Sequence, residues 1–269
     1  PLNRVGIDIG PSTIAVVAPG LVRIYSLNPE KGKYDDEIAR LQQEMDSERR
    51  RMNPDNYDDK GCIKPKKERK PWVNSPEYER LLKKLRKLTR NQRIERDEYQ
   101  NKIMNEILSY GTIIIVEKMN FRALQRRAKK TTINEKTGLP NSKGRYGKSI
   151  GYGAPAAFLK RLDLKLKAIG SQLYEVATAK VKASQFNHKT GEYEKNEKNP
   201  LSRWKKIGRD TVQRDLYSAF LLMNVNNSLY RVNRASCNRT YREFLELMNK
   251  EIERVRALGP DYPLAWYVK

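Results

Sequence analysis

The sequence has very little cysteine and histidine, and it has no long apolar segment. Its 269 residues include two cysteines, Cys62 and Cys237, and one histidine, His188. So few thiols exclude a disulfide framework and every four-cysteine zinc site. His188 has no cysteine near it, so we expect an ordinary polar residue, no bound zinc and no cysteine–histidine nucleophile. No apolar run approaches the ~20 residues that a membrane-spanning helix needs, so no membrane partner is expected.

Targeting and nucleotide-binding signals are missing as well. The first residues enter an apolar segment at once and show no signal peptide. The chain begins at Pro1 instead of Met, so we expect a piece of a longer chain. The lack of a signal peptide, an apolar span and a disulfide framework together predicts a cytoplasmic protein. A GxxxxGK[ST] phosphate-binding loop does not occur. The segment GRYGKS at 144–149 has some likeness to one, but no apolar strand precedes it.

Positive charge is abundant and clustered. Lys and Arg number 55 against 32 Asp and Glu, which gives a formal net charge of +23. Residues 63–102 hold 14 basic and 6 acidic side chains, and residues 118–148 hold 10 basic ones with Glu135 as the single acid. Aromatic residues lie beside both stretches. This pattern favours a nucleic-acid surface, because each phosphate contact releases counterions; solvated helix faces and a polar loop are the alternative.

The order of apolar and polar segments predicts an α/β fold. Three short apolar runs joined by turn pairs such as Pro19-Gly20 predict an antiparallel meander. A later continuous apolar run predicts a central strand that is covered on both faces. Together they indicate a mixed sheet flanked by helices, the ribonuclease H-like arrangement. We expect strands at 4–10, 13–18, 21–27, 112–119 and 172–177, and helices at 35–52, 75–110, 154–169, 210–225 and 239–258.

Three acidic residues stand in unusual positions. Asp8 lies inside the apolar segment VGIDIG, where a carboxylate is costly unless a cation or hydrogen-bond donors compensate its charge. Glu117 ends the apolar run IIIVE, and Asp215 lies early in an apolar-faced helix. Asp210 competes for the third position, but Asp210 and Gln213 have the spacing of a capping box. We therefore expect Asp210 to cap the helix.

Magnesium accounts for such a trio of carboxylates. It prefers carboxylate oxygens and water and uses few protein ligands. Two ions ~4 Å apart can activate a water molecule and stabilise the leaving oxygen of a phosphodiester. Taken singly, Glu117 could be a surface residue beside Lys118, and Asp215 could interact with a helix N-terminus.

With these residues in view, the chain resembles the RuvC-like nuclease portion of the TnpB family, transposon-encoded RNA-guided DNA endonucleases related to type V CRISPR effectors. The similarity covers nearly the whole chain. The acidic segments are VGIDIGPSTIAVV, IIIVEKMNFRALQRRAKK and VQRDLYSAFLLMNV; LTRNQRIERDEYQNKI, GRYGKSIGYGAPAAFLKRL and KVKASQFNH are also similar to family segments.

The resemblance implies a RuvC-type nuclease centre at Asp8, Glu117 and Asp215, holding two Mg²⁺ or Mn²⁺ ions. Base pairing with a guide RNA would select the DNA, and the protein would contact the target and non-target strands. A RuvC-like domain is then expected at 1–34 and 75–269, with an inserted polar and helical excursion at 35–74. The expected nucleic-acid contacts are Arg122, Arg126, Arg127, Lys129, Lys130, Lys143, Arg145 and Lys148.

The chain departs from this family in two respects. Family members often carry a four-cysteine zinc ribbon between the second and third acidic segments, and this interval contains no cysteine. Nothing here corresponds to the N-terminal half of the relatives, which recognises RNA and the DNA motif. Two other readings stay open: a nuclease-dead RNA-guided DNA-binding repressor, and an unguided ribonuclease H-like resolvase or transposase.

Overall fold

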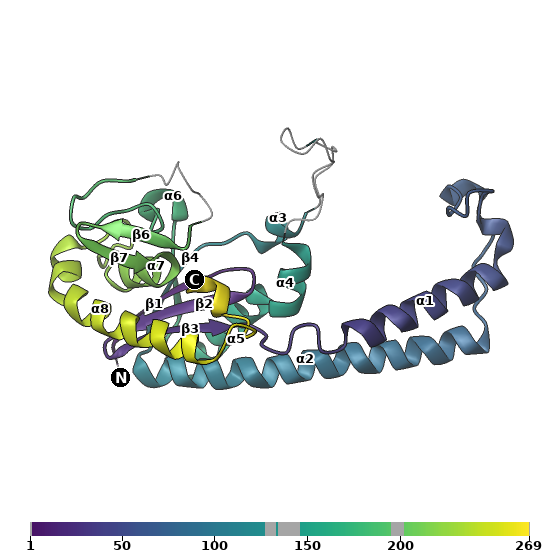
Figure 1. Ribbon diagram of the computed structural model, residues 1–269, viewed down its shortest axis with the longest axis horizontal. Coiled ribbons are helices and arrows are strands. Elements are labelled where there is room, and N and C mark those ends of the chain that lie inside the picture. Colours follow the sequence, from purple (N-terminus) through teal and green to yellow (C-terminus); the bar gives the residue numbers. More distant parts are fainter. Residues whose placement is uncertain (1, 127–132, 134–145, 195–201, 269) are drawn as a thin grey trace. The chain divides into compact units, whose positions relative to one another are not determined.

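The computed structural model describes residues 2–126, 133, 146–194 and 202–268. The chain forms two compact units: Pro1–Pro29 with Gln100–Lys269, and Glu30–Tyr99. We call them the sheet unit and the hairpin unit, and Figure 1 labels most of their helices and strands. The expected insertion at 35–74 falls inside the hairpin unit, which also takes in the long helix up to Tyr99.

The sheet unit is built on a five-stranded mixed sheet. Strands β1, β2 and β3 form the expected antiparallel meander, while β4 pairs parallel to β1 and β5 parallel to β4. The strand order is therefore β3-β2-β1-β4-β5, with β1 and β4 inside the sheet. The turn after β2 uses Gly20 at φ 76°, a conformation that glycine adopts without strain. The strand bounds are Arg4–Ile9, Thr13–Ala18, Leu21–Ser26, Ile113–Glu117 and Leu173–Val176.

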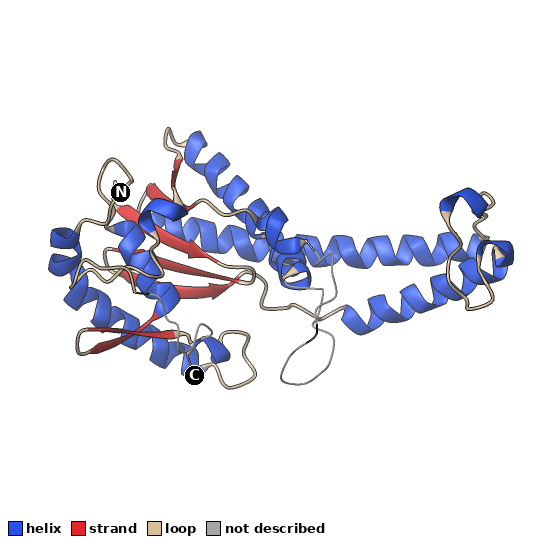
Figure 2. Cartoon of the chain, turned by 90° about the horizontal axis from the view of Figure 1, so that it is seen from above, coloured by secondary structure: helices blue, strands red, loops and turns tan. Residues whose placement is uncertain are grey.

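Helices cover both faces of this sheet (Figure 2). Helix α7 (Arg214–Met223) packs against β1 and β2, and α8 (Arg234–Ala257) packs against β3. These two helices share one apolar core with Ala15, Ile24 and Ile115 of the strands. Helix α5 (Pro155–Ala168) and the last part of α2 (Pro76–Tyr110) supply further fully buried side chains for the sheet unit, including Phe158 and Met104. The remaining helices of the unit are α3 (Phe121–Gln125), α4 (Gly147–Gly153), α6 (Thr178–Val181) and the 3-10 turn Ala265–Tyr267.

A second small sheet corrects one prediction. Strands β6 (Trp204–Ile207) and β7 (Asp210–Gln213) pair antiparallel around Gly208, so the helix expected from Asp210 begins at Arg214. The β-branched pair Thr211-Val212 extends the chain, and the side-chain oxygen of Gln213 accepts the hydrogen bond from the Leu216 amide at 2.7 Å. The prediction that Asp210 caps this helix is wrong. Its carboxylate pairs with the Lys189 ammonium instead, at 2.9 Å.

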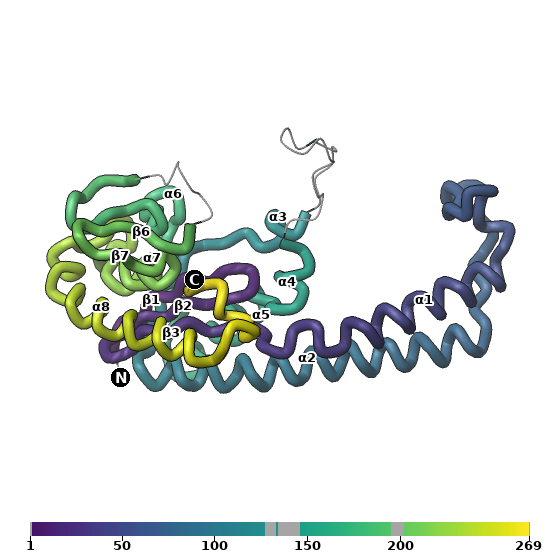
Figure 3. The backbone as a smooth tube through the Cα atoms, in the orientation of Figure 1, coloured from purple at the N-terminus to yellow at the C-terminus, as the bar shows by residue number. Residues whose placement is uncertain are grey.

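The hairpin unit consists of two antiparallel helices and a polar connection (Figure 3). Helix α1 (Asp35–Met52) packs on the first part of α2 through Leu41, Met45, Tyr78 and Leu81. The connection contains two 3-10 turns, Pro54–Asn56 and Lys66–Glu68. Two buried asparagines, Asn53 and Asn56, bind the backbone of Val73 and Lys70, so the polar excursion has a fixed course.

The start of the long helix was predicted correctly. Helix α2 begins at Pro76, and the Ser75 hydroxyl accepts a hydrogen bond from the Tyr78 amide at 3.0 Å. Helix α8 begins at Arg234, earlier than the expected residue 239, because the Asn233 side chain caps it by accepting from the Ser236 amide. None of the helices in the described part of the chain is long and apolar enough to cross a membrane.

The contact between β1 and α7 depends on Gly6. A Cβ atom on Gly6 would lie 1.9 Å from the Ala219 carbonyl oxygen and 2.4 Å from the Met223 nitrogen, both of them backbone atoms of α7. We expect Gly6→Ala to lower the free energy of unfolding by about 3 kcal/mol, because α7 must move away from the sheet. Urea unfolding followed by circular dichroism measures this.

The matched control is Gly151→Ala in α4, where a Cβ atom would meet no atom within 4 Å. This change should alter stability by less than about 0.5 kcal/mol. Equal effects of the two substitutions would show that the close approach of α7 is not what requires glycine at position 6.

Candidate functional site

Asp8, Glu117 and Asp215 come from three elements that meet on one face of the sheet. A side chain at Gly6 would point at α7, and side chains two residues apart on a strand share a face, so Asp8 also points to the α7 side. Glu117 ends β4, directly after the residue pair Ile7 and Val116 of the parallel ladder, which puts it level with Asp8. Its face is that of Ile115, which belongs to the α7 core.

Helix α7 brings the third carboxylate to the same place. Ala219 contacts β1 at Gly6, and Asp215 lies one helical turn before Ala219 on the same side of α7. Asp8 lies two residues after Gly6 along β1. The helical turn from Ala219 back to Asp215 runs in the same direction, so Asp215 comes to lie near Asp8. All three carboxylates consequently line one pocket of about 470 Å³. The structure thus brings together three residues that are widely separated in the sequence.

The charges of these acids are only partly compensated. The pKa of Asp8 lies well above its ordinary value, first because the carboxylate is desolvated and then because the negative charges of Asp215 and Glu117 are near. Arg214 and a hydrogen bond from Ser218 act in the opposite direction. Burial also raises the pKa of Glu117, against the hydrogen bond that its carboxylate accepts from the Ala183 amide at 3.2 Å.

Two arginines hold the third acid. Arg203 Nη1 lies 3.1 Å from Asp215 Oδ2, and Arg214 Nε lies 3.5 Å from Asp215 Oδ1. The Arg203 guanidinium also lies over the rings of Trp266 and Tyr267, at 4.3 and 4.6 Å from their centroids. The sequence analysis did not select Arg203, because it is one of several basic residues in a polar stretch. The sequence around Arg203 does not indicate that Trp266 and Tyr267 pack against it.

The donor chemistry of the pocket suits a hard divalent cation, which prefers carboxylate oxygens. Burial raises the pKa of Asp8 most, and an added positive charge would relieve the further rise that comes from the negative charges of Asp215 and Glu117. Within the described residues, however, no three His, Cys, Asp or Glu side chains form a group able to hold a metal ion. The two arginines on Asp215 occupy oxygens that such a group would use. The residues fit a divalent cation in kind, and binding would require Asp215 to exchange partners.

Three of the expected nucleic-acid contacts can be located. Arg122 and Arg126 are exposed in and just after α3, and Lys148 is exposed in α4. Leu124 of α3 and Tyr146, which precedes α4, line the carboxylate pocket, so these short helices border it. The other expected contacts lie outside the described residues: Arg127, Lys129, Lys130, Lys143 and Arg145.

The expectation that His188 is an ordinary polar residue is wrong. The residue is fully buried against the rings of Tyr217, Phe220 and Tyr241, and its Nδ1 lies 2.8 Å from the Tyr217 hydroxyl. Burial lowers the His188 pKa to about 4, with smaller effects from nearby cations. The histidine is therefore neutral at physiological pH and belongs to the core under α7. Because His188 stands among polar residues in the sequence, its burial could not be predicted from its neighbours.

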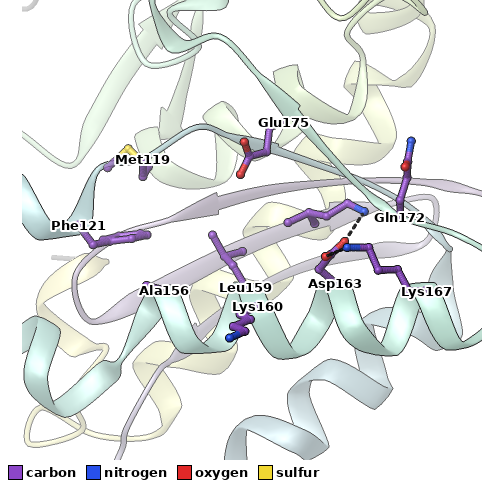
Figure 4. Close-up of a pocket in the computed structure, with 10 residues that line it drawn as sticks. Met119, Phe121, Ala156, Leu159, Lys160, Asp163, Lys167, Gln172 and Glu175 are labelled. Atoms are coloured by element: carbon purple, nitrogen blue, oxygen red, sulfur yellow. Dashed lines mark hydrogen bonds and ion pairs between the residues drawn. The ribbon is translucent and has the colours of Figure 1, made fainter.

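A second pocket, of about 530 Å³, lies beside α5 and β5 (Figure 4). Asp163 accepts a hydrogen bond from the Leu173 amide and pairs with Lys167 at 2.6 Å, so its charge ties the helix to the strand. Lys160 and Glu175 bring charges of both signs to the same pocket. This mixture does not favour an anionic ligand over a cationic one, and the carboxylate pocket stays the candidate site.

The raised pKa of Asp8 predicts an effect on stability without any reaction. The native chain binds the Asp8 proton more tightly than the unfolded chain, so this group stabilises the fold at low pH and loses that contribution as pH rises through its folded pKa. Asp8→Asn should therefore increase the free energy of unfolding at pH 8 without divalent cations, by about 1 kcal/mol, and the gain should shrink toward pH 4. Urea titrations across this range measure it.

Asp163→Asn is the matched control, since Lys167 lowers the pKa of Asp163 and this carboxylate stabilises the fold when charged. It should reduce stability at pH 8. A loss of stability in both variants would contradict the assignment of Asp8 as an uncompensated carboxylate.

Comparison with known proteins does not assign the chain to a family. No protein-family model matches the sequence, and no curated protein matches it closely enough to count as a relative. What the pocket can do therefore follows from its own carboxylates and arginines.

Proposed function

We propose that this chain is the catalytic portion of a metal-dependent DNA endonuclease with a RuvC-type, ribonuclease H-like fold. The observation that carries the proposal is the convergence of Asp8, Glu117 and Asp215 on one pocket, from the end of β1, the end of β4 and the first turn of α7. In the full-length parent, a guide RNA would select the DNA. Guidance rests on the resemblance of the acidic segments to the TnpB family.

The sheet topology supports the fold assignment. An antiparallel meander supplies the central strand β1, and β4 joins it in parallel on its other side. The two adjacent parallel strands end at the same edge of the sheet, so acids at their carboxyl ends meet there. A helix over the same edge adds the third acid.

The three carboxylates would hold Mg²⁺ or Mn²⁺, in a two-ion arrangement. When bound, such ions supply an activated water and stabilise the leaving oxygen of the phosphodiester. Glu117 is positioned by the Ala183 amide, which donates a hydrogen bond to its carboxylate at 3.2 Å. Arg203 and Arg214 present guanidinium groups in the same pocket, where they would contact the phosphate and offset its charge.

The surface beside the pocket supports a polyanionic substrate. Arg122 and Lys148 are exposed on the short helices that border it, and Arg126 is exposed directly after the first of them. Tyr146 is an exposed aromatic residue of the pocket lining. The whole chain has a net charge of +23. Such a surface attracts both DNA strands and an RNA without reading their sequence.

Removing one carboxylate tests the proposal. Single changes Asp8→Ala, Glu117→Ala and Asp215→Ala should each lower cleavage of labelled single-stranded DNA with Mg²⁺ or Mn²⁺ by at least about 10³-fold, because each removes a metal ligand. Electrophoresis of the products under single-turnover conditions measures this. Glu246→Gln, a surface acid paired with Arg242, is the control and should cleave like the unchanged chain.

Undiminished cleavage in all three variants would refute the proposed centre. Because the parent could require further chain and RNA, the assay is repeated with the full-length protein and its co-purified RNA. Absence of cleavage there would instead support a DNA-binding repressor, and efficient cleavage without any RNA would support an unguided enzyme.

A second test concerns the basic segment after β4. Arg126→Gln combined with Arg127→Gln should weaken DNA binding and reduce the slope of log affinity against log salt by about 1–2, because two phosphate contacts are lost. Fluorescence anisotropy in EDTA at several salt concentrations measures both. Lys250→Gln combined with Arg242→Gln, on the exposed side of α8, removes two charges elsewhere and serves as control. An identical slope in the first variant would exclude this segment as a contact surface.

A further inference from the structure

A hollow of about 860 Å³ lies in the sheet unit, apart from the carboxylate pocket. Its walls come from residues 180–193 and from the loop 226–234, and it shares no lining residue with the carboxylate pocket. We call it the tyrosine hollow and define it by Lys180, Phe186, Tyr193, Tyr230, Arg231 and Arg234. The proposed catalytic centre does not use any of these residues.

Two aromatic side chains are exposed in this hollow. Tyr193 is 50% exposed and Tyr230 is 53% exposed, so the core does not need either ring. Tyr193 is nevertheless fixed, because its ring packs on Phe186 at 5.1 Å between centroids and its hydroxyl donates to the Lys180 carbonyl oxygen at 3.2 Å. Exposed, oriented aromatic rings are the platforms on which unpaired bases stack.

Positive charges lie next to both rings. Lys180 Nζ is 4.0 Å from the Tyr230 ring centroid, and Lys182 Nζ is 5.8 Å from that of Tyr193. Among the described residues that line the hollow, Arg231 and Arg234 add charge and none is acidic. This combination of cations and rings is complementary to a strand that offers phosphates and bases together.

The loop that carries Tyr230 is held in place before any ligand binds. The Asn226 side-chain oxygen accepts hydrogen bonds from the Tyr230 and Arg231 amides, at 3.1 and 3.2 Å. Leu229 lies in the left-handed region at φ 63°, a strained conformation that persists only where the surroundings impose it. Arg234 donates to the carbonyl oxygens of His188, at 2.8 Å, and Lys189. A prepared surface loses little conformational entropy on binding.

We propose that the tyrosine hollow binds an unpaired DNA strand by stacking bases on Tyr193 and Tyr230. The Lys180 ammonium, which covers one face of the Tyr230 ring, moves to a phosphate when a base takes its place. Lys182 and Arg231 contact neighbouring phosphates. The inference rests on the proposed function for the identity of the ligand, since DNA is the substrate proposed there. It assigns a site for the strand away from the point of cleavage.

Binding measured without metal tests this site separately from the chemistry. The probe is a fluorescent 12-nucleotide thymidine strand, titrated in EDTA with the complete 269-residue chain and followed by anisotropy. Tyr193→Leu combined with Tyr230→Leu should weaken binding by at least about tenfold, because two stacking surfaces are lost. The matched variant with Phe at both positions keeps the rings and should bind within about twofold of the unchanged chain. A blunt duplex of the same length should be bound equally by all three proteins.

Charge is tested in the same assay. Lys180→Gln should weaken binding of the strand and reduce its salt dependence, whereas Lys250→Gln, on the exposed surface of α8, should change neither. Circular dichroism confirms that each variant is folded. Unchanged affinity in the folded double Leu variant overturns the proposal, and so does an equal loss in the Phe and Leu variants.

Two outcomes separate this site from other interpretations. If a uridine strand is bound more tightly than the thymidine strand and loses affinity in the Leu variant, while the thymidine strand does not, the hollow is an RNA site and the assignment to DNA is wrong. The cleavage assay with Asp8→Ala reports on the proposed function alone. Suppose that the unchanged chain cuts DNA and that the double Leu variant binds the strand as tightly as the unchanged chain does. This result would refute the strand site in the tyrosine hollow and leave the proposed function intact.

Discussion

The direct contact of α7 with β1 at Gly6 is the constraint on which the sheet unit depends. Because residue 6 has no side chain, the Ala219 carbonyl approaches the strand far more closely than any Cβ atom would allow. The same contact fixes the height of α7 above the sheet, and with it the place of Asp215 relative to Asp8. Packing of the core and assembly of the pocket therefore depend on the same helix. Helix α7 buries Phe220 and Leu221 in the core and places Asp215 in the pocket.

The pocket that results is electrostatically unfavourable for the fold. A desolvated carboxylate at Asp8 faces two further acids, while the arginines are engaged with Asp215. Folding energy from the surrounding apolar core must offset this repulsion, a pattern common at functional sites. The local field of the acids would repel a polyanion unless exposed cations such as Arg122 and Lys148 reversed it at longer range.

Much of the sheet could be inferred from the local sequence pattern. Alternation and apolar runs predicted β1 to β4 closely, because each strand is buried by its own residues, and Asp8 stood out against such a run. Features set by distant partners could not be inferred. The strand Asp210–Gln213 exists because residues 204–207 pair with it, and His188 is buried because α7 and α8 close around it. The guanidinium of Arg203 lies beside Asp215 and against the rings of Trp266 and Tyr267, which are far away in the sequence.

The aromatic support of Arg203 has a consequence for how the pocket could work. Rings of Trp266 and Tyr267 hold the guanidinium independently of Asp215, and the Tyr267 hydroxyl lies 3.2 Å from Ser12 Oγ in the turn after β1. If a divalent cation took the Asp215 oxygens, Arg203 would lose its ion pair but keep its stacking contacts. The guanidinium would then lie beside the pocket without an acidic partner, which is the state in which it can bind a phosphate most strongly. Arg203 and the proposed metal ions would therefore not exclude each other, because the guanidinium that now neutralises Asp215 would become available to hold a phosphate if the ions were bound.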